Sequence, residues 1–467
     1  MKVNTLFTLV TCLSSQGVFA KPKPTYHEVD VAIVGGGATG AYAAVRLRED
    51  YGKSVLVIEK QNRLGGHVHA YSGGERPINY GVQAYLNRDT TAAFFKRFNV
   101  GLIDPDLVSS ADLLFSTKDI DFDTGKRVDP DYGAINATVG LAGYIALAVK
   151  YQSWFENGYF NTGDVPEDLL LPFGEYLNKY EIGSSLAILR TFIWLSDAVN
   201  TPTWFVLAVV GQPQLAALGL GLTGPSFKWP STYSSETLFD RVLDLIRKDV
   251  LLESTVASSR RTAKGVELVV QTPSGKQHVK AKKLLFAATP SPDNVDTWDL
   301  DKNEESLFSK FSWETLYVGV VGKTGLPSDV TGIRNAPDNS TNFYLPRGDF
   351  VDAYTRAGSQ DLWTTRVIGR ASLTASKAKS MIKQVFGKMD AAGTYDVNDP
   401  DIVAFASHGL TVPKVSPKEL KAGFYKKLYA LQGQRNTFWT GLAWAPDYTP
   451  ILWDFTEKLF PQILAGI

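Results

Sequence analysis

Cysteine is almost absent from this chain of 467 residues, in which Cys12 is the only one. The chain beyond residue 12 therefore has no disulfide, no thiolate nucleophile, no cysteine-ligated metal site and no cysteinyl-linked cofactor. A chain without disulfides depends on the size of its buried core. With 44% hydrophobic and 12% aromatic residues, this chain has ample material for a large core.

Histidine and net charge are also scarce. No two histidines have the spacing and carboxylate context of a metal site, so we predict no metal. No G-x-S-x-G sequence is present, so a hydrolase triad has no support. Lys+Arg and Asp+Glu are both 48, and no excess of positive charge would attract a nucleic acid. The five histidines are His27, His67, His69, His278 and His408.

Long hydrophobic runs are missing as well. Residues 204–222 are nearly free of charge, but Gln212, Pro213 and Gln214 interrupt them before the ~20 apolar residues that a membrane span needs. We therefore expect this stretch to form a buried wall of a binding site and not to contact a membrane.

Residues 1–20 have the layout of a secretory signal. Lys2 precedes an apolar stretch from Leu6 to Leu13, and Ala20 provides a small residue for cleavage. The alternative is that this segment is the first helix of a domain, but Lys21-Pro22-Lys23-Pro24 would break such a helix. We predict a secreted protein. The N-glycosylation sequons at Asn136 and Asn339 fit that route.

A strand, a glycine-rich turn and a helix follow one another near the start of the chain. The apolar run 29–34 precedes a G-x-G-x-x-G pattern, and residues 41–47 have helical character. In such a unit the glycines allow a sharp turn and a close approach of backbone amides to a diphosphate at the helix N-terminus. The residues predicted to do this are Gly35, Gly37, Ala38, Thr39 and Gly40.

An acid and a second glycine pair distinguish between nucleotide cofactors. Glu59 ends the next apolar run, where a carboxylate can accept hydrogen bonds from both ribose hydroxyls; the alternative is a solvent-facing strand end. An Arg and paired glycines follow, and they offer a guanidinium and free amides to the diphosphate of a long cofactor. NAD sites usually lack this second element. The residues are Lys60, Arg63, Gly65, Gly66 and His67.

These motifs resemble the flavin-containing amine oxidase superfamily, and more closely the fungal β-cyclopiazonate dehydrogenase family. The resemblance is carried by the sequences of residues 34–40, 64–68 and 80–83. It implies FAD as the cofactor, with Gly81, Val82 and Gln83 along the isoalloxazine ring. It also implies that Val256 meets the adenine. Ala288 would lie at a strand end next to the dinucleotide, together with Thr440 and Gly441, although Leu442 replaces the usual acid of that last motif.

The same resemblance leaves the substrate side open. Amine oxidases commonly place a lysine on the first strand of the substrate sheet, and residues 315–321 contain none, which puts amine oxidation in doubt. Trp444 and Tyr448 stand where some members have an aromatic cage, or they belong to the core. His408 is a candidate base, or a structural histidine.

The order of elements predicts an α/β fold, in which a Rossmann-like FAD-binding domain (amine-oxidase or GR2 type) is interleaved with an α+β substrate domain. We expect strands at 315–321, 342–345 and 363–370 and a helix over 376–389. The predicted segments are the signal 1–20, FAD-binding parts 21–100, 231–300 and 431–467, a mostly helical substrate part 101–230, and a second substrate part 301–430.

These observations predict an FAD-dependent oxidoreductase. It would remove a hydride from a small, largely apolar metabolite, with oxidative ring closure as the family name implies, and O2 or another acceptor would reoxidise the flavin. Three alternatives stay open: an amine or amino-acid oxidase that releases peroxide, a flavin isomerase or mutase without net redox, and a binding protein without turnover.

Overall fold

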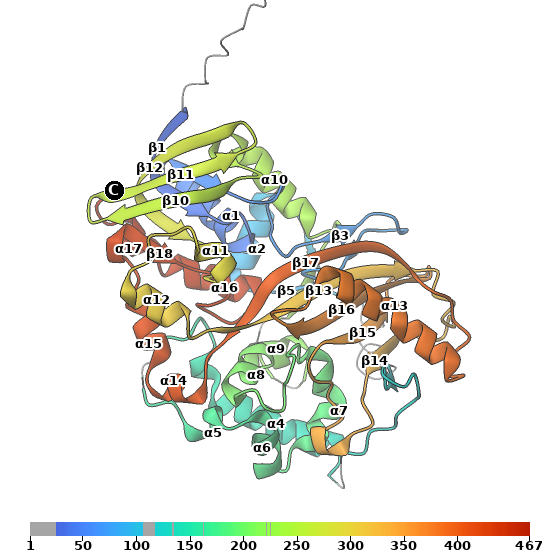
Figure 1. Ribbon diagram of the computed structural model, residues 1–467. Coiled ribbons are helices and arrows are strands. Elements are labelled where there is room, and N and C mark those ends of the chain that lie inside the picture. Colours follow the sequence, from blue (N-terminus) through green and yellow to red (C-terminus); the bar gives the residue numbers. More distant parts are fainter. Residues whose placement is uncertain (1–24, 106–116, 133–134, 162, 221, 225) are drawn as a thin grey trace, which may run out of the picture.

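The computed structural model describes residues 25–105, 117–132, 135–161, 163–220, 222–224 and 226–467. The predicted secretory signal lies outside these residues. Figure 1 shows two parts: an upper one built around a first sheet, and a lower one with a second sheet and a layer of helices beneath it.

The first sheet has seven strands in the order β10-β11-β12-β1-β2-β9, with β18 paired to β12. Strands β18, β12, β1, β2 and β9 run parallel to their neighbours, whereas β10, β11 and β12 form an antiparallel meander. The seven strands are β1 (Thr25–Val34), β2 (Val55–Ile58), β9 (Val250–Leu251), β10 (Thr255–Thr262), β11 (Gly265–Thr272), β12 (Gly275–Phe286) and β18 (Thr437–Trp439).

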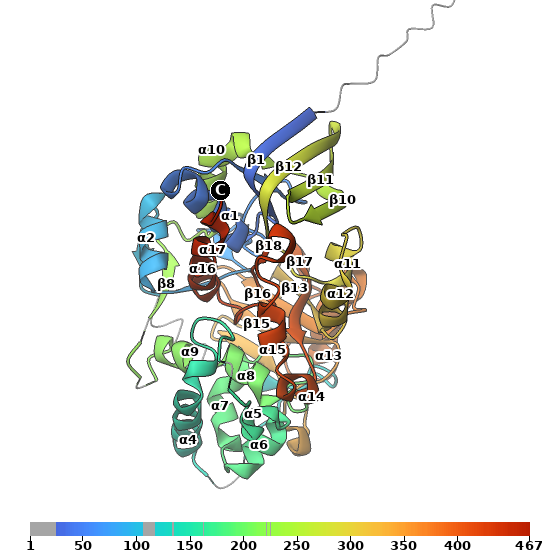
Figure 2. The same ribbon diagram turned by 90° about the vertical axis from the view of Figure 1, so that its left-hand side faces the viewer.

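Three helices from distant parts of the chain pack together on this sheet. The helix α1 (Ala38–Val45) is almost wholly buried because α10 (Glu236–Ile246) and α16 (Thr449–Glu457) both pack against it. Figure 2 shows the same three helices beside β1. A helix begins after Ser235, and β11 and β12 form an antiparallel hairpin. Nearby helices are α2 (Asp89–Arg97), α11 (Pro292–Val295), α12 (Lys302–Phe308) and α17 (Phe460–Leu464).

The second sheet has six strands in the order β17-β13-β16-β15-β14-β7. All pairs are antiparallel except β14 with β7. The helix α13 (Ala375–Ala391) covers one face, and the phenol of Tyr354 donates a hydrogen bond to the Ile382 carbonyl of this helix at 2.7 Å. The strands are β7 (Lys118–Ile120), β13 (Ser312–Gly322), β14 (Gly332–Asn335), β15 (Phe350–Arg356), β16 (Leu362–Arg370) and β17 (Asp401–Lys414).

A layer of short helices lies below the second sheet (Figure 1). Within 204–222, which we expected to be buried, α8 and α9 contain Trp204 at 1% exposure and Leu215 at 0%. None of the described helices is both long and apolar enough to cross a bilayer. The helices of the layer are α4 (Ala137–Lys150), α5 (Glu167–Leu170), α6 (Phe173–Lys179), α7 (Leu186–Leu189), α8 (Thr203–Val209) and α9 (Gln212–Ala217).

Short elements connect the two parts. The helices α14 and α15 precede β18, the small strands β5 and β6 pair with β8, and β3 pairs with β4. Their bounds are β3 (Ala70–Tyr71), β4 (Ile78–Asn79), β5 (Tyr85–Leu86), β6 (Leu102–Ile103), β8 (Phe227–Pro230), α14 (Pro417–Lys421) and α15 (Phe424–Tyr429). The segment 101–230 is thus not purely helical, because β6, β7 and β8 lie within it. The domain boundaries themselves stay a prediction.

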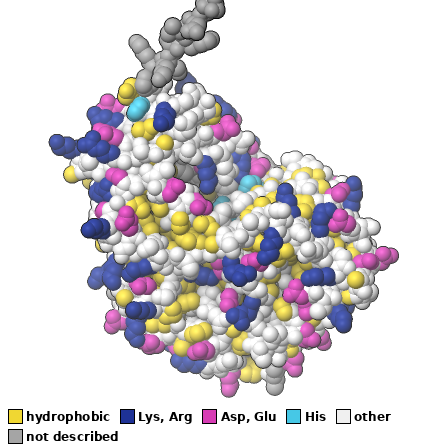
Figure 3. Space-filling model, viewed as in Figure 1, with side chains coloured by type: hydrophobic (Ala, Val, Ile, Leu, Met, Phe, Trp, Pro, Cys, Tyr) yellow, Lys and Arg dark blue, Asp and Glu magenta, His cyan; other side chains and the backbone are white. Residues whose placement is uncertain are grey.

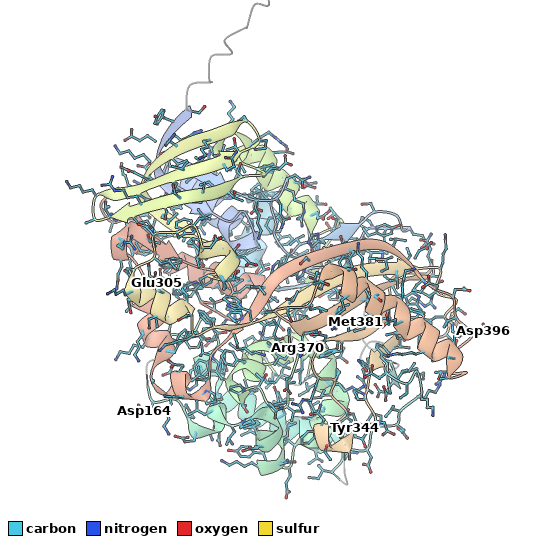
Figure 4. The ribbon with its side chains drawn as sticks, viewed as in Figure 1. Asp164, Glu305, Tyr344, Arg370, Met381 and Asp396 are labelled. Atoms are coloured by element: carbon cyan, nitrogen blue, oxygen red, sulfur yellow. The ribbon has the colours of Figure 1, made fainter. Side chains whose placement is uncertain are left out.

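The expected strand at 342–345 is wrong. Residues Ser340–Asn342 form a 3-10 turn, and Phe343 and Tyr344 have left-handed φ values of 53° and 54°, which no strand adopts. The side chain of Asn339 accepts a hydrogen bond from the Thr341 amide and closes the turn. The short run of aromatic and apolar residues belongs instead to the core, because Tyr344, labelled in Figure 4, and Leu345 are buried.

Candidate cofactor site

The first glycine turn joins β1 to α1 and packs backbone against backbone. Gly35 has a φ of 97°, and a Cβ atom there would lie 3.1 Å from the amide nitrogen of Ala288. At Gly40 a Cβ atom would lie only 1.9 Å from the Gly35 carbonyl oxygen. Both positions therefore require glycine, and Ala288 lies beside the turn as predicted.

Glu59 follows β2 and is 5% exposed. Its carboxylate accepts hydrogen bonds from the amides of Gly36, at 2.6 Å, and Gln61, at 2.7 Å. Each oxygen uses one lone pair for these bonds and keeps another for a ribose hydroxyl. The Ser254 amide bonds the Glu59 carbonyl at 2.9 Å, which brings the segment before Val256 next to the same acid.

The second glycine turn lies directly against the first. The Gly65 amide donates to the Gly36 carbonyl at 2.9 Å, and Gly37 and Gly65 form a β-bridge. Gly66 has a φ of 59°, and a Cβ atom there would lie 3.0 Å from the Cα atom of Gly37. Two stretches of bare backbone thus meet at one place, which is the requirement for a diphosphate held by amides.

Arg63 fixes this second turn from within. Its guanidinium donates to the carbonyls of Leu64, at 3.1 Å, and Gly66, at 2.9 Å, and lies 3.0 Å from Nδ1 of His69. These bonds hold the Gly65–Gly66 backbone in place. Direct contact of Arg63 or of the exposed Lys60 with the diphosphate stays a prediction.

The segment of Gly81, Val82 and Gln83 lies next to the second turn. A Cβ atom at Gly81 would lie 2.1 Å from the His67 carbonyl oxygen, so glycine is needed for this approach. The Ser235 hydroxyl donates to the Val82 carbonyl at 3.1 Å, and the Gln83 side chain is exposed. Contact of these residues with the isoalloxazine ring stays a prediction.

Three of the five histidines gather at the junction of the two sheets, which sequence reasoning missed. The rings of His67 and His408 stack with centroids 4.1 Å apart, and His67 Nε2 lies 3.0 Å from the His408 carbonyl. His69 stacks on His408 from 5.8 Å. Figure 3 shows histidine side chains between the upper and lower parts of the molecule. The two sequence positions are 341 residues apart, so no local pattern could reveal the contact.

Burial keeps these histidines neutral. It lowers the pKa of His67 to about 4 and that of His69 to about 3, and the positive charge of Arg63 adds to both effects. Burial also holds the pKa of His408 well below its usual range. A catalytic base works best when its pKa is close to the working pH, so the lowered pKa argues against His408 as the proton acceptor. A catalytic role of His408 stays a prediction.

The C-terminal segment returns to the first glycine turn. The Thr440 amide donates to the Phe286 carbonyl at 2.9 Å, and a Cβ atom at Gly441 would lie 3.3 Å from the Ala287 carbonyl oxygen. From α16, the indole Nε1 of Trp453 donates to the Ala38 carbonyl at 3.0 Å. The strand β18, the loop after it and the helix α16 thus meet the residues of the cofactor turn.

Trp444 and Tyr448 belong to a large aromatic cluster. Trp444 is fully buried, and its carbonyl accepts a hydrogen bond from the phenol of Tyr429. The Tyr448 phenol donates to the Val209 carbonyl of the helical layer at 2.8 Å. Both side chains therefore have structural contacts, and a cage role stays a prediction. The neighbouring rings of this cluster are Tyr159, Trp204, Tyr425 and Tyr429.

Asp447, between these two residues, was not singled out from the sequence. Its side chain is accessible although Trp444 and Ala445 before it and Pro450 after it are buried. It forms no hydrogen bond or ion pair with any residue that the structure describes, and desolvation by the surrounding protein raises its pKa to about 6 although the side chain is accessible. The sequence does not single out such an acid, because only the fold brings its apolar neighbours around it.

No lysine lies on β13, in agreement with the sequence. Instead Glu314 of β13 forms a buried ion pair with Lys414 of the neighbouring strand β17, and side-chain exposures are 3% and 14%. Glu314 also accepts hydrogen bonds from the amide and hydroxyl of Ser196, at 2.9 and 2.8 Å. Glu314 and its partner Lys414 thus connect the two strands to the helical layer through Ser196. In the described part of the chain, no cluster of three potential metal ligands occurs.

The residues present fit FAD. The two glycine turns approach each other so closely that a Cβ atom at Gly40 or Gly66 would crowd the backbone of the first turn. Beside them, the carboxylate of Glu59 can still accept hydrogen bonds from a ribose. Beside the second turn, Nε2 of His408 is a buried polar atom without a partner among the described residues, as expected where a polar group is to bind.

Comparisons with known proteins agree with this geometry. Residues 33–98 match the NAD(P)-binding Rossmann-like domain family. The chain is 32% identical to β-cyclopiazonate dehydrogenase of Aspergillus oryzae over 94% of its length and 93% of that protein. It is 33% identical to the FAD-dependent oxidoreductase oblC of Cochliobolus heterostrophus, covering 100% of this chain and 99% of that one.

Solved structures show the same fold. A conjugated-linoleic-acid-producing fatty acid isomerase from P. acnes superposes with a TM-score of 0.71 at 19% identity, covering 93% of this chain and 98% of that one. A putrescine oxidase bound to putrescine gives 0.62 at 15% identity, covering 94% and 100%. The predicted Rossmann-like fold of the amine-oxidase type is therefore confirmed. The chain belongs to the family of fungal FAD-dependent oxidoreductases of secondary metabolism that includes β-cyclopiazonate dehydrogenase, and it is an FAD-dependent oxidoreductase.

Proposed function

We propose that this oxidoreductase is a secreted enzyme that removes a hydride from a small, largely apolar metabolite, and that ring closure follows the oxidation. The aromatic cluster around Trp444 and Tyr448 supports an apolar substrate, because its rings offer an apolar surface. The name of β-cyclopiazonate dehydrogenase supports a cyclised product. We further propose that O2 or another acceptor takes the electrons.

The observation that carries the proposal is the contact of the two glycine turns beside Glu59. The amides near Gly37 and Gly66 would hold the diphosphate, and the carboxylate of Glu59 would hold the ribose. Bound there, FAD supplies an acceptor for a hydride or for single electrons. The buried aromatic rings exclude water from the substrate, and the neutral histidines add no charge near the cofactor.

A visible spectrum and an anaerobic titration test the proposal. We expect a yellow protein whose colour bleaches when β-cyclopiazonate or another small, largely apolar metabolite is added without oxygen. Release of hydrogen peroxide on readmission of air would identify O2 as the acceptor. A colourless protein that takes up no added FAD would contradict the proposal.

Secretion and glycosylation form a separate part of the proposal. Asn136 caps α4 and Asn339 opens the 3-10 turn, and both side chains are exposed. Their exposure supports modification in a secretory route. We expect N-glycosidase to increase the electrophoretic mobility of the protein from a fungal culture medium, and N136Q/N339Q to abolish that increase. A protein found only inside the cells would contradict this part.

The fatty acid isomerase among the structural neighbours supports a second candidate, a flavin isomerase without net redox. A requirement for reduced flavin with no consumption of acceptor would identify it. For the third candidate, an amine or amino-acid oxidase, peroxide release on a panel of amines is the test, and the absence of a lysine from β13 speaks against it.

A further inference from the structure

A small cavity lies between the second sheet and the helical layer. Its volume is about 20 Å³. A single water molecule needs roughly 10–15 Å³, so the cavity has room for one guest of about that size. Its walls come from the 3-10 turn after α7, from β14 and β15, and from the turn that Tyr344 marks in Figure 4. The polar lining residues are Arg190, Thr191, Arg334, Asn335 and Asp352, and the others are apolar.

Positive charge exceeds negative charge at this cavity. Arg190 and Arg334 both form ion pairs with the same acid, Asp119 of β7, the latter at 2.6 Å. The side chain of Arg190 is only 2% exposed. The carboxylate of the lining, Asp352, is already bound by Arg366 at 2.6 Å. Among these described residues three guanidinium groups therefore share two carboxylates, and one positive charge is left without a counterion.

Hydrogen-bond donors are also left over at the cavity. A guanidinium has five N–H groups, and that of Arg190 donates two hydrogen bonds within the described part of the chain, to Tyr132 at 2.7 Å and to Asp119. The hydroxyl of Thr191 accepts a hydrogen bond from Arg334 at 3.0 Å, and it donates none to a described residue. The lining thus offers N–H and O–H groups to an acceptor that the protein itself does not provide.

The charge of Arg190 cannot be removed by loss of a proton. Burial, and after it the repulsion by Arg334, lowers the pKa of Arg190, but an arginine stays protonated in a protein. A buried charge without a partner is costly, and the cost disappears when a counterion binds. The counterion has to be small, because the cavity is too small for a phosphate or a sulfate.

We propose that the cavity binds one small monovalent anion of the size of chloride. The anion accepts hydrogen bonds from Arg190 and from the Thr191 hydroxyl, and it balances the charge that Asp119 leaves uncompensated. It thereby stabilises the contact of β14 and β15 with the helical layer. The proposal is independent of the proposed function, because none of these residues belongs to the cofactor turns.

Thermal unfolding of the holoenzyme in sodium chloride and in sodium gluconate tests the proposal. Gluconate is too large for the cavity, and equal ionic strength keeps the screening of surface charges equal. We expect chloride to raise the unfolding midpoint by about 1–3 °C and the effect to saturate, since a ligand that binds the folded chain stabilises it. In crystals grown with bromide in place of chloride, we expect an anomalous-scattering peak in the cavity.

Two variants of equal shape separate the site from a general effect of salt. Thr191→Asp places a carboxylate beside Arg334 and supplies the missing negative charge, whereas Thr191→Asn places a neutral group there. We expect Thr191→Asp to lose the chloride dependence and Thr191→Asn to keep it. The control Arg370→Gln, at an exposed arginine of β16 that is labelled in Figure 4, should also keep it.

The wild-type protein decides even if Thr191→Asp does not fold. Equal unfolding midpoints in the two salts, or a bromide crystal without a peak in the cavity, would overturn the proposal. An equal chloride effect in Thr191→Asp and wild type would overturn it as well, because the ion would then act elsewhere on the protein.

Discussion

At the scale of single residues, Glu59 is the side chain on which the adenosine half of the site depends. In Glu59→Gln the amide oxygen can still accept from Gly36, but the charge-assisted bonds to the ribose are lost. We expect FAD to bind about 10- to 100-fold more weakly, since a hydrogen bond to a charged group contributes about 1.5–3 kcal/mol. Fluorescence titration of the apoprotein with FAD measures this.

The matched control is Glu305→Gln, on the exposed surface of α12 (Figure 4). It removes the same charge and should leave FAD affinity unchanged. If both variants lose affinity equally, net charge and not the ribose contact would be the cause.

The raised pKa of Asp447 makes the stability of the protein depend on pH. The folded protein has a carboxyl pKa of about 6 here, above the ordinary value of 3.8, so this group binds more protons when folded. Its contribution is therefore complete below about pH 4 and is lost as the pH rises through about 6. We expect D447N to melt at a higher temperature than wild type at about pH 8 and at the same temperature at about pH 4. An equal melting temperature at both pH values would mean that the folded protein does not raise the pKa of this carboxyl.

At the scale of elements, two helical glycines have opposite requirements. Gly40 in α1 cannot hold a side chain, because its Cβ would lie 1.9 Å from the Gly35 oxygen, whereas nothing lies within 4 Å of a Cβ at Gly387 in α13. We expect Gly40→Ala to be isolated without flavin and to lose about 1–3 kcal/mol of stability. Gly387→Ala should retain flavin and gain up to about 1 kcal/mol. Denaturant unfolding of both variants measures the change in stability, and their visible spectra show whether flavin is bound.

The ion pair of Glu314 and Lys414 connects β13 to β17, and Ser196 extends the connection to the helical layer. Lys414→Met leaves the carboxylate buried and unpaired, so we expect a loss of about 3–5 kcal/mol in the free energy of unfolding. The double variant Lys414→Met/Glu314→Gln should recover most of that loss. If the single variant costs less than about 1 kcal/mol, water must reach Glu314.

Local elements could be predicted from the sequence, and elements that depend on distant partners could not. The turn between β1 and α1 could be predicted because the spacing of its glycines, Gly35 and Gly40 among them, is itself the signal of this turn. By contrast, β15 and β17 alternate poorly, and their pairing partners in β16 and β13 identify them. The prediction of a strand at 342–345 was wrong because a short run of aromatic and apolar residues is also found in a buried turn, as it is here at Tyr344 and Leu345. Of the site, the glycine and acid positions could be predicted, but the contact of His67 with His408 and the isolation of Asp447 follow from the tertiary fold alone.

At the scale of the whole molecule, the FAD-binding part is assembled from three segments, which supply α1, α10 and α16. A ligand that contacts all three stabilises the folded chain as a unit. We expect a single thermal transition whose midpoint rises with FAD, by an amount equivalent to about 2.7 kcal/mol at a concentration 100 times the dissociation constant. Two separate transitions, with only one of them shifted by FAD, would show that the two parts unfold independently.

The central claim is that the paired glycine turns hold FAD. Titration of flavin-free protein with FAD, followed by fluorescence quenching, tests it most directly when wild type and Gly66→Val are compared, since a side chain at Gly66 would press on Gly37. The account predicts saturation at one FAD per wild-type chain and no saturable binding by the variant. Equal binding by both proteins, or none by wild type, would contradict it.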